Sequence, residues 1–133
     1  GQKQRVSIAG IIAMRPKCIV LDEPTAMLDP VGRAEVVRTI RDLNKNQGIT
    51  VILITHHMSE TIDADRLIIM SEGRIIQDGR PSEVFTHVEE LLSAGLTVPE
   101  TTQLLYGLRR DGMQLPLEAL SVEECAQAIY TLL

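Results

Sequence analysis

The chain has 133 residues, of which 44% are hydrophobic and 23% are charged, and its formal net charge is −5. A chain of this length and composition suits one globular domain or part of one, and it is too hydrophobic to be intrinsically disordered. The negative net charge and an aromatic content of 2% argue against nucleic-acid binding through bulk charge or base stacking.

Helix-like and strand-like segments alternate in the amino-terminal part of the chain. Residues 2–14 form an apolar pattern nearly all round, which predicts a largely buried helix. The short apolar runs 18–21 and 50–54 are typical of strands covered on both faces. Between them, Asp29-Pro30 predicts a capped helix start. Strand, helix and strand in this order imply a crossover connection and parallel pairing.

A hairpin and at least three short helices are predicted in the rest of the chain. The apolar runs 67–70 and 74–77 flank Glu72-Gly73, which is a hairpin signal. A helix is marked by apolar residues between Val84 and Leu92. Capping boxes predict where two further helices begin: Thr97-x-x-Glu100 and Ser121-x-x-Glu124.

Charge changes along the chain together with the predicted structure. Residues 1–80 carry 11 Lys and Arg against 10 Asp and Glu, whereas residues 81–133 carry 2 against 8. We therefore expect a domain boundary near Arg80-Pro81. The two cysteines cannot form a disulfide framework, and both Cys18 and Cys125 are expected to be small buried hydrophobic residues, which fits a reducing compartment.

Two acidic residues directly follow the first predicted strand. Asp22 and Glu23 would stand at the carboxyl end of a parallel strand, the edge where open α/β sheets bind ligands. A carboxylate there can hold Mg²⁺, usually through water, and its neighbour could polarise a water for attack on a phosphoanhydride. The alternative interpretation is a solvated strand end without chemistry.

The second predicted strand ends in Thr55-His56-His57, at the same edge if the two strands are neighbours. An imidazole at position 56 can donate a hydrogen bond to a terminal phosphate oxygen and to an attacking water. Two alternatives stay open: the histidines merely end the strand, or they ligate a metal with a third residue. Metal ligation is the weakest of these, because adjacent side chains of a strand point to opposite faces.

Gly1-Gln2 opens the first predicted helix, and a helix amino terminus preceded by glycine is a natural phosphate site. A polar helix start is the simpler interpretation of these residues alone. The order of all the motifs, however, resembles the ABC-type ATPase domain of membrane transporters. Gly1-Gln2 looks like the end of the Leu-Ser-Gly-Gly-Gln signature, and residues 18–22 look like the Walker B strand. Residues 26–29 match the D-loop, and His56 matches the switch histidine.

This resemblance covers residues 1–80. It implies an α/β fold that is part of a P-loop NTPase, with a mainly parallel sheet and a small α-helical region at residues 81–133. It also implies ATP and Mg²⁺ as cofactors, and two ATPase domains that enclose ATP between them.

The resemblance further implies a role for each matching residue. Asp22 would assist Mg²⁺ through water, and Glu23 would be the catalytic base. His56 would hold the terminal phosphate. Gly1, Gln2 and Asp29 would lie near ATP across the interface between the two ATPase domains.

The chain departs from the family pattern in one large respect. It contains no Gly-x-x-x-x-Gly-Lys-Ser/Thr segment, so the loop that cradles the phosphates is absent. The chain also opens on Gly1 within helix-forming sequence. We therefore expect it to be part of a larger protein and to be inactive alone. His57 stands where relatives more often have Asp, a change we expect to be tolerated.

The tail resembles the carboxyl-terminal region of energy-coupling factor ATPases at residues 80–85, 95–100 and 108–116. This implies a subunit that energises uptake of vitamins or of cobalt or nickel ions. Its partners would be transmembrane subunits and a second ATPase subunit, identical or paralogous, at the cytoplasmic face of the membrane, with no nucleic acid. The alternatives are an ATPase of another ABC importer, a non-transport ABC ATPase, and a non-enzymatic dimerisation or regulatory module.

Overall fold

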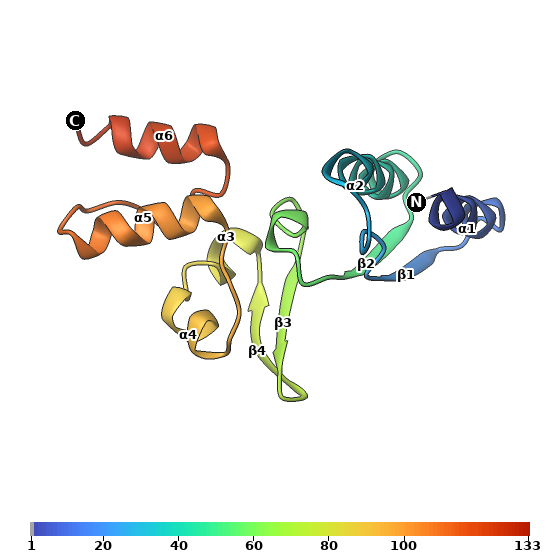
Figure 1. Ribbon diagram of the computed structural model, residues 1–133, viewed down its shortest axis with the longest axis horizontal. Helices are drawn as coiled ribbons and strands as arrows, with labels where there is room; N and C mark the ends of the chain where they lie inside the picture. Colours follow the sequence, from blue (N-terminus) through green and yellow to red (C-terminus); the bar gives the residue numbers. More distant parts are fainter. Residues whose placement is uncertain (1) are drawn as a thin grey trace. The chain divides into compact units, whose positions relative to one another are not determined.

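The computed structural model describes residues 2–133, in which helices and strands alternate early and helices dominate later (Figure 1). The helices and strands, in chain order, are α1 (Gln2–Ala13), β1 (Cys18–Asp22), α2 (Pro30–Lys45), β2 (Thr50–Ile54), the 3-10 helix η1 (Met58–Glu60), β3 (Leu67–Ser71), β4 (Arg74–Gly79), α3 (Pro81–Val84), α4 (Val88–Ser93), α5 (Glu100–Arg110) and α6 (Val122–Tyr130).

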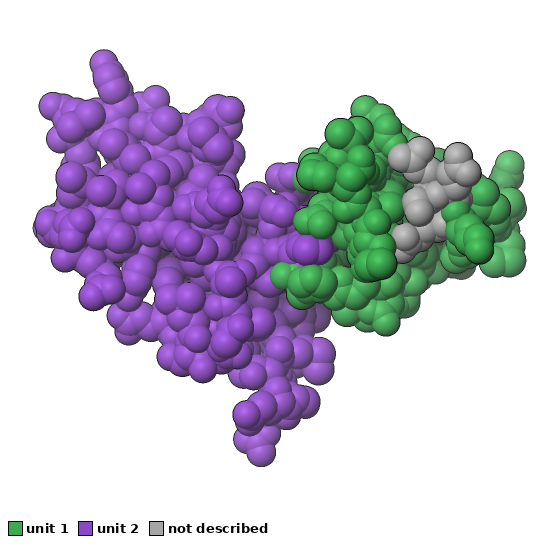
Figure 2. All heavy atoms as spheres, viewed as in Figure 1, with its two compact units in different colours: residues 1–56 green, residues 57–133 purple. Residues whose placement is uncertain are grey.

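Packing divides the chain into two compact units, residues 1–56 and residues 57–133 (Figure 2). Each unit has a hydrophobic cluster of its own. The hairpin of β3 and β4 shares the second cluster with the helices that follow it, since Leu67 and Ile69 pack with Val84 and Phe85. The domain boundary expected near Arg80-Pro81 stays a prediction about the whole protein.

The first unit is a parallel pair of strands joined by a helix. β1 and β2 pair in parallel from Cys18 opposite Thr50 to Asp22 opposite Ile54, as predicted. The connecting helix α2 begins as expected, with Asp29 as its N-cap and Pro30 at its first position. The buried residues of α2 pack with buried residues of α1 and β1 and with Ile49, the residue directly before β2. Together they form one hydrophobic cluster: Ile8, Ile19, Leu21, Val36, Ile40, Leu43 and Ile49.

Only one face of this strand pair is covered, so three expectations about burial were wrong. Ile19 and Leu21 are buried, but the alternate residues of β1, including Cys18, are exposed. Val20 is 59% exposed and Ile52 50%. In helix α1, most of the residues whose burial is described are exposed, and Ile8 is buried, so the helix is not largely buried over that part. The physical reason is that α1 and α2 contribute to a single cluster, which buries every second strand residue and leaves the others open.

In the second unit, the predicted hairpin follows the short helix η1. β3 and β4 pair antiparallel, and Arg66 donates two hydrogen bonds to the Asp78 carboxylate, at 2.8 and 2.7 Å. The two turn residues, Glu72 and Gly73, both have positive φ, the conformation that a tight two-residue hairpin turn requires. The hydrogen bond from Arg66 lowers the pKa of the Asp78 carboxyl below its ordinary value.

Four helices, rather than the minimum of three, complete the second unit around fully buried Phe85, Leu91 and Leu105. The capping box at Ser121 is confirmed: Ser121 Oγ accepts from the Glu124 amide at 3.1 Å, and Glu124 Oε2 accepts from the Ser121 amide at 3.1 Å. The box predicted at Thr97 is wrong, because α5 begins at Glu100 with Pro99 in the cap position. A residue that precedes proline disfavours the helical conformation, so Val98 cannot be the first helical residue.

Two adjacent threonines of α5 provide a test of the second core. Thr102 is fully buried and its Oγ1 has no hydrogen-bond partner among the described residues. Thr101 Oγ1 donates to the Leu120 carbonyl oxygen at 2.9 Å. Replacing Thr102 with Val removes an unsatisfied buried hydroxyl at nearly constant volume, so we expect Thr102→Val to stabilise α5 by about 1 kcal/mol. Slower hydrogen exchange of the α5 amides would measure this.

Thr101→Val is the matched control, since it removes a hydroxyl that has a partner. It should destabilise the same amides by about 1 kcal/mol. If Thr102→Val speeds exchange as much as Thr101→Val does, the Thr102 hydroxyl has a partner and the assignment is wrong.

Candidate functional site

β1 and β2 end at the same edge of the sheet. Asp22 is opposite Ile54, and the Glu23 amide continues the pairing by donating to the Ile54 carbonyl oxygen at 2.9 Å. The residues that follow the two strands are therefore neighbours in space. This is the edge at which the sequence placed the acidic pair and the first histidine.

The side chains of Glu23 and His56 are in direct contact. Glu23 Oε1 lies 2.8 Å from His56 Nδ1, and the two side chains are 33% and 70% exposed. The second carboxylate oxygen, Oε2, is buried and has no hydrogen-bond partner within the described part of the chain. Thus one oxygen is bound to the imidazole, while the other keeps unused acceptor capacity.

Glu23 has an unusual backbone conformation directly after β1. Its φ is +46°, in the left-handed region that residues other than glycine seldom adopt. The Ala26 amide donates to the Glu23 carbonyl oxygen at 3.1 Å, which closes a turn directly after the strand. Such strain costs of order 1–3 kcal/mol and is concentrated at functional sites in proteins.

Asp22 is exposed at the end of β1, one residue before Glu23. Among the described residues, no group of three or more His, Cys, Asp or Glu side chains is arranged to hold a metal ion. A single carboxylate still suits Mg²⁺, which keeps several waters and is often bound through one or two carboxylates together with substrate phosphates. The carboxylate of Asp22 is therefore chemically suited to a magnesium ion that phosphate oxygens of a substrate also bind.

Asp29 lies at the end of the loop between β1 and α2, and its side chain accepts a hydrogen bond within its own chain. Its Oδ1 accepts from the Gly32 amide at 3.0 Å and so caps α2. A Cβ at Gly32 would lie 2.7 Å from that oxygen, which explains the glycine. Gln2 is the first residue of α1, whereas Gly1 lies outside the described residues.

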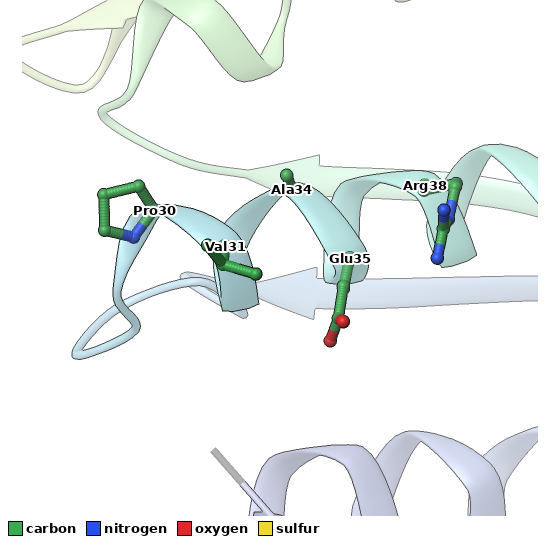
Figure 3. A pocket seen from close by; sticks show the side chains of 5 residues that line it. All are labelled: Pro30, Val31, Ala34, Glu35 and Arg38. Atoms are coloured by element: carbon green, nitrogen blue, oxygen red, sulfur yellow. The ribbon is translucent and has the colours of Figure 1, made fainter.

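A groove elsewhere in the first unit does not coincide with this chemistry. It has a volume of about 530 Å³ and runs along α2 (Figure 3), where it is lined by Pro30, Val31, Ala34, Glu35 and Arg38. It is open and mainly apolar. Neither Glu23 nor His56 lines it, so the candidate site is defined by the strand edge and not by the groove.

Comparison with solved structures defines the class of protein. The chain matches the structure of cbiO1 from Clostridium perfringens, part of the ABC transporter complex cbiONQ, with 43% identity and a TM-score of 0.60, over 69% of this chain and 37% of that one. It also matches a dimeric ATP-binding cassette in a post-hydrolysis state bound to ADP and Pi, with 30% identity and a TM-score of 0.56, over 59% and 34% of the two chains. The fold is that of an ABC ATPase domain, as the motifs predicted.

Sequence relatives narrow this class. The chain is 60% identical over 129 residues to the energy-coupling factor transporter ATP-binding protein EcfA1 of Caldanaerobacter subterraneus, covering 97% of this chain and 47% of that protein. It is 54% identical over 132 residues to EcfA1 of Clostridium perfringens, covering 99% and 47%. No family model matches. The chain is therefore similar to ATP-binding proteins of energy-coupling factor transporters and spans about half the length of these relatives.

No helix among the described residues is long and apolar enough to span a membrane.

The cap at the start of α2 yields a prediction. Asp29→Ala removes the acceptor of the Gly32 amide and should destabilise the helix by about 1 kcal/mol, whereas Asp29→Asn, an equally good N-cap residue, should leave it nearly unchanged. Hydrogen exchange of the first α2 amides measures both effects. Equal exchange rates in Asp29→Ala and the parent protein would contradict the capping role.

Proposed function

We propose that this chain provides the water-activating part of an ATP-binding subunit, and that the complete subunit hydrolyses ATP to energise solute uptake by an energy-coupling factor transporter. The observation that carries the proposal is the 2.8 Å contact between Glu23 Oε1 and His56 Nδ1 at the strand edge. A carboxylate and an imidazole are the groups that general-base catalysis and phosphate recognition require. The similarity to EcfA1 proteins supports the transport assignment.

Glu23 is the proposed general base. Its Oε2 keeps free lone pairs, and a carboxylate oxygen can take the proton of a water that attacks the terminal phosphate. Because Oε2 is covered in the observed conformation, a small rotation of the carboxylate must bring an oxygen to the water. Before ATP binds, the contact with His56 holds the other oxygen.

His56 is the proposed phosphate-binding residue. Its Nδ1 faces Glu23, so Nε2 is the ring atom that would donate to a phosphate oxygen. A neutral imidazole carries only one N–H, so simultaneous donation to both groups requires the doubly protonated ring. In the neutral ring, binding of the phosphate releases the donation to Glu23.

Asp22 is the proposed magnesium residue. Mg²⁺, when bound, neutralises charge on the phosphate oxygens. Asp22 would hold it through water at the exposed end of β1, which leaves the adjacent Glu23 to act as base.

The proposal includes a second ATP-binding subunit, identical or paralogous. Gly1, Gln2 and Asp29 would lie near ATP at the interface between the two subunits. The transmembrane subunits of the transporter would be further partners, which places the protein at the cytoplasmic face of the membrane. The transported solute would be a vitamin or a cobalt or nickel ion.

The direct test of this function is Glu23→Gln in the complete subunit. Glutamine retains the shape and the oxygen that contacts His56 but cannot accept a proton. We expect ATP hydrolysis to slow by about 10²–10⁴-fold while ATP still binds. Steady-state turnover and equilibrium ATP binding measure the two effects, and normal turnover would remove Glu23 from the mechanism.

His56→Ala and His57→Ala form a matched pair for the same assay. His56→Ala should lower turnover more than ATP affinity, because the phosphate contact matters most as charge develops. His57→Ala should change turnover little. A loss confined to affinity at position 56, or an equal loss at both positions, argues against the role given to His56.

The 133-residue chain alone should neither bind ATP saturably nor hydrolyse it, since it has no Gly-x-x-x-x-Gly-Lys-Ser/Thr loop. Its open strand face, with exposed Val20, Ile52 and Ile54, should also cause self-association. Calorimetry with MgATP and gel filtration of the purified chain test both statements. Saturable ATP binding or steady ATPase activity would contradict the first, and a monodisperse monomer would contradict the second.

A further inference from the structure

His56 lies in a short connection between two regular elements. β2 ends at Ile54 and the 3-10 helix η1 begins at Met58, so residues 55–57 are the whole connection. The end of β2 is held by the Glu23 amide, which donates to the Ile54 carbonyl oxygen at 2.9 Å. The backbone at His56 is therefore restrained by the sheet on one side, and the turn at η1 follows directly on the other.

Backbone hydrogen bonds close the turn at η1. The Glu60 amide donates to the His57 carbonyl oxygen at 3.1 Å, and the Thr61 amide donates to the Met58 carbonyl oxygen at 3.1 Å. The first of these bonds holds the carbonyl group of the residue that directly follows His56. The conformation of the turn is thus passed along the chain to the imidazole through one residue.

Thr61 closes the same turn a second time with its side chain. Its Oγ1 donates to the Met58 carbonyl oxygen at 2.8 Å, which is the oxygen that also accepts the Thr61 amide. Thr61 is only 8% exposed. The side chains of Met58 and Ile62 pack against the hydrophobic cluster that contains Phe85. The turn is therefore anchored in a core, and a buried, satisfied hydroxyl favours one arrangement of it.

We infer that Thr61 is a positioning residue for His56 in ATP hydrolysis. This inference rests on the proposed function, in which His56 holds the terminal phosphate. The Thr61 hydroxyl acts through the Met58 carbonyl group and the turn, and it needs no contact with the nucleotide. Because a displacement of about 1 Å at a reacting group can lower a rate by about 10²-fold, loosening this turn is sufficient to affect turnover.

The kinetic test compares Thr61→Val with Thr61→Ser in the complete subunit. Valine keeps the size of threonine and removes the hydroxyl, whereas serine keeps the hydroxyl and removes a methyl group. Thr61→Val should lower kcat for ATP hydrolysis about 10-fold and leave ATP affinity within about twofold of the parent, because the phosphate contact matters most in the transition state. Thr61→Ser should keep kcat within about twofold of the parent.

Thermal unfolding separates this effect from a loss of stability. Both variants should lower the unfolding temperature by similar amounts, since one loses a hydrogen bond and the other a buried methyl group. Similar stability with unequal turnover would assign the kinetic effect to the hydroxyl.

The nitrogen NMR signals of the histidine rings provide a readout that does not depend on turnover. In the parent subunit without nucleotide, the His56 Nδ1 signal reports the contact with Glu23, which is 2.8 Å long in the structure. Thr61→Val should shift or broaden this signal, and Thr61→Ser should restore it. His87, the N-cap residue of α4, is the control and should keep its signals in both variants.

Four outcomes would overturn the inference. Turnover of Thr61→Val within twofold of the parent would show that the hydroxyl does not act on the reaction, even if the His56 signal shifts. An equal loss of turnover in Thr61→Ser would show that packing matters and the hydrogen bond does not. An unchanged His56 signal in Thr61→Val, or equal changes at His56 and His87, would remove the specific link to His56. Because the ring signals need no turnover, failure of the proposed function in the Glu23→Gln test is distinguishable from failure at Thr61.

Discussion

The parallel register of β1 on β2 is the constraint on which the candidate site depends. Because Asp22 is opposite Ile54, the residues that leave the two strands emerge together, and Glu23 and His56 come within hydrogen-bond distance although 33 positions separate them in sequence. A slip of one residue would turn every side chain of the slipped strand to the other face and separate this pair. The buried Ile19 and Leu21 oppose such a slip, since it would expose them.

Backbone strain is concentrated next to this edge. Among the described residues, four other than glycine have positive φ, and two of them, Glu23 and Met27, lie within one loop. The loop is held by the strand pairing at one end and by the Asp29 cap at the other. Strain of this kind persists only where the surrounding structure enforces it. The arrangement is consistent with a loop whose shape serves the side chains it presents.

Local signals in the sequence predicted most of the secondary structure. The Asp29-Pro30 cap, the Glu72-Gly73 turn and the Ser121 capping box each act through residues three or four positions apart, so a single sequence contains the necessary information. The capping box predicted at Thr97 does not form, because Pro99 disfavours the helical conformation in the residue before it. This local effect outweighed the capping pattern. The predicted pairing of the two strands also indicated that Asp22, Glu23 and His56 lie at one edge of the sheet.

Burial was harder to predict, because it depends on what covers a residue. The alternation along β1 left Cys18 and Val20 exposed, although the continuous apolar run is equally typical of a strand covered on both faces. The direct contact of Glu23 with His56 could also not be predicted from the sequence. It depends on the left-handed backbone conformation of Glu23. A glycine or asparagine at this position would have indicated that conformation in the sequence, but a glutamate does not.

A crystal structure of the complete subunit with Mg²⁺ and a non-hydrolysable ATP analogue tests the central claim most directly. We expect a water within hydrogen-bond distance of both the Glu23 carboxylate and the terminal phosphate, with an imidazole nitrogen of His56 on a phosphate oxygen. A terminal phosphate that contacts neither side chain, with Glu23 paired only within its own chain, would contradict it.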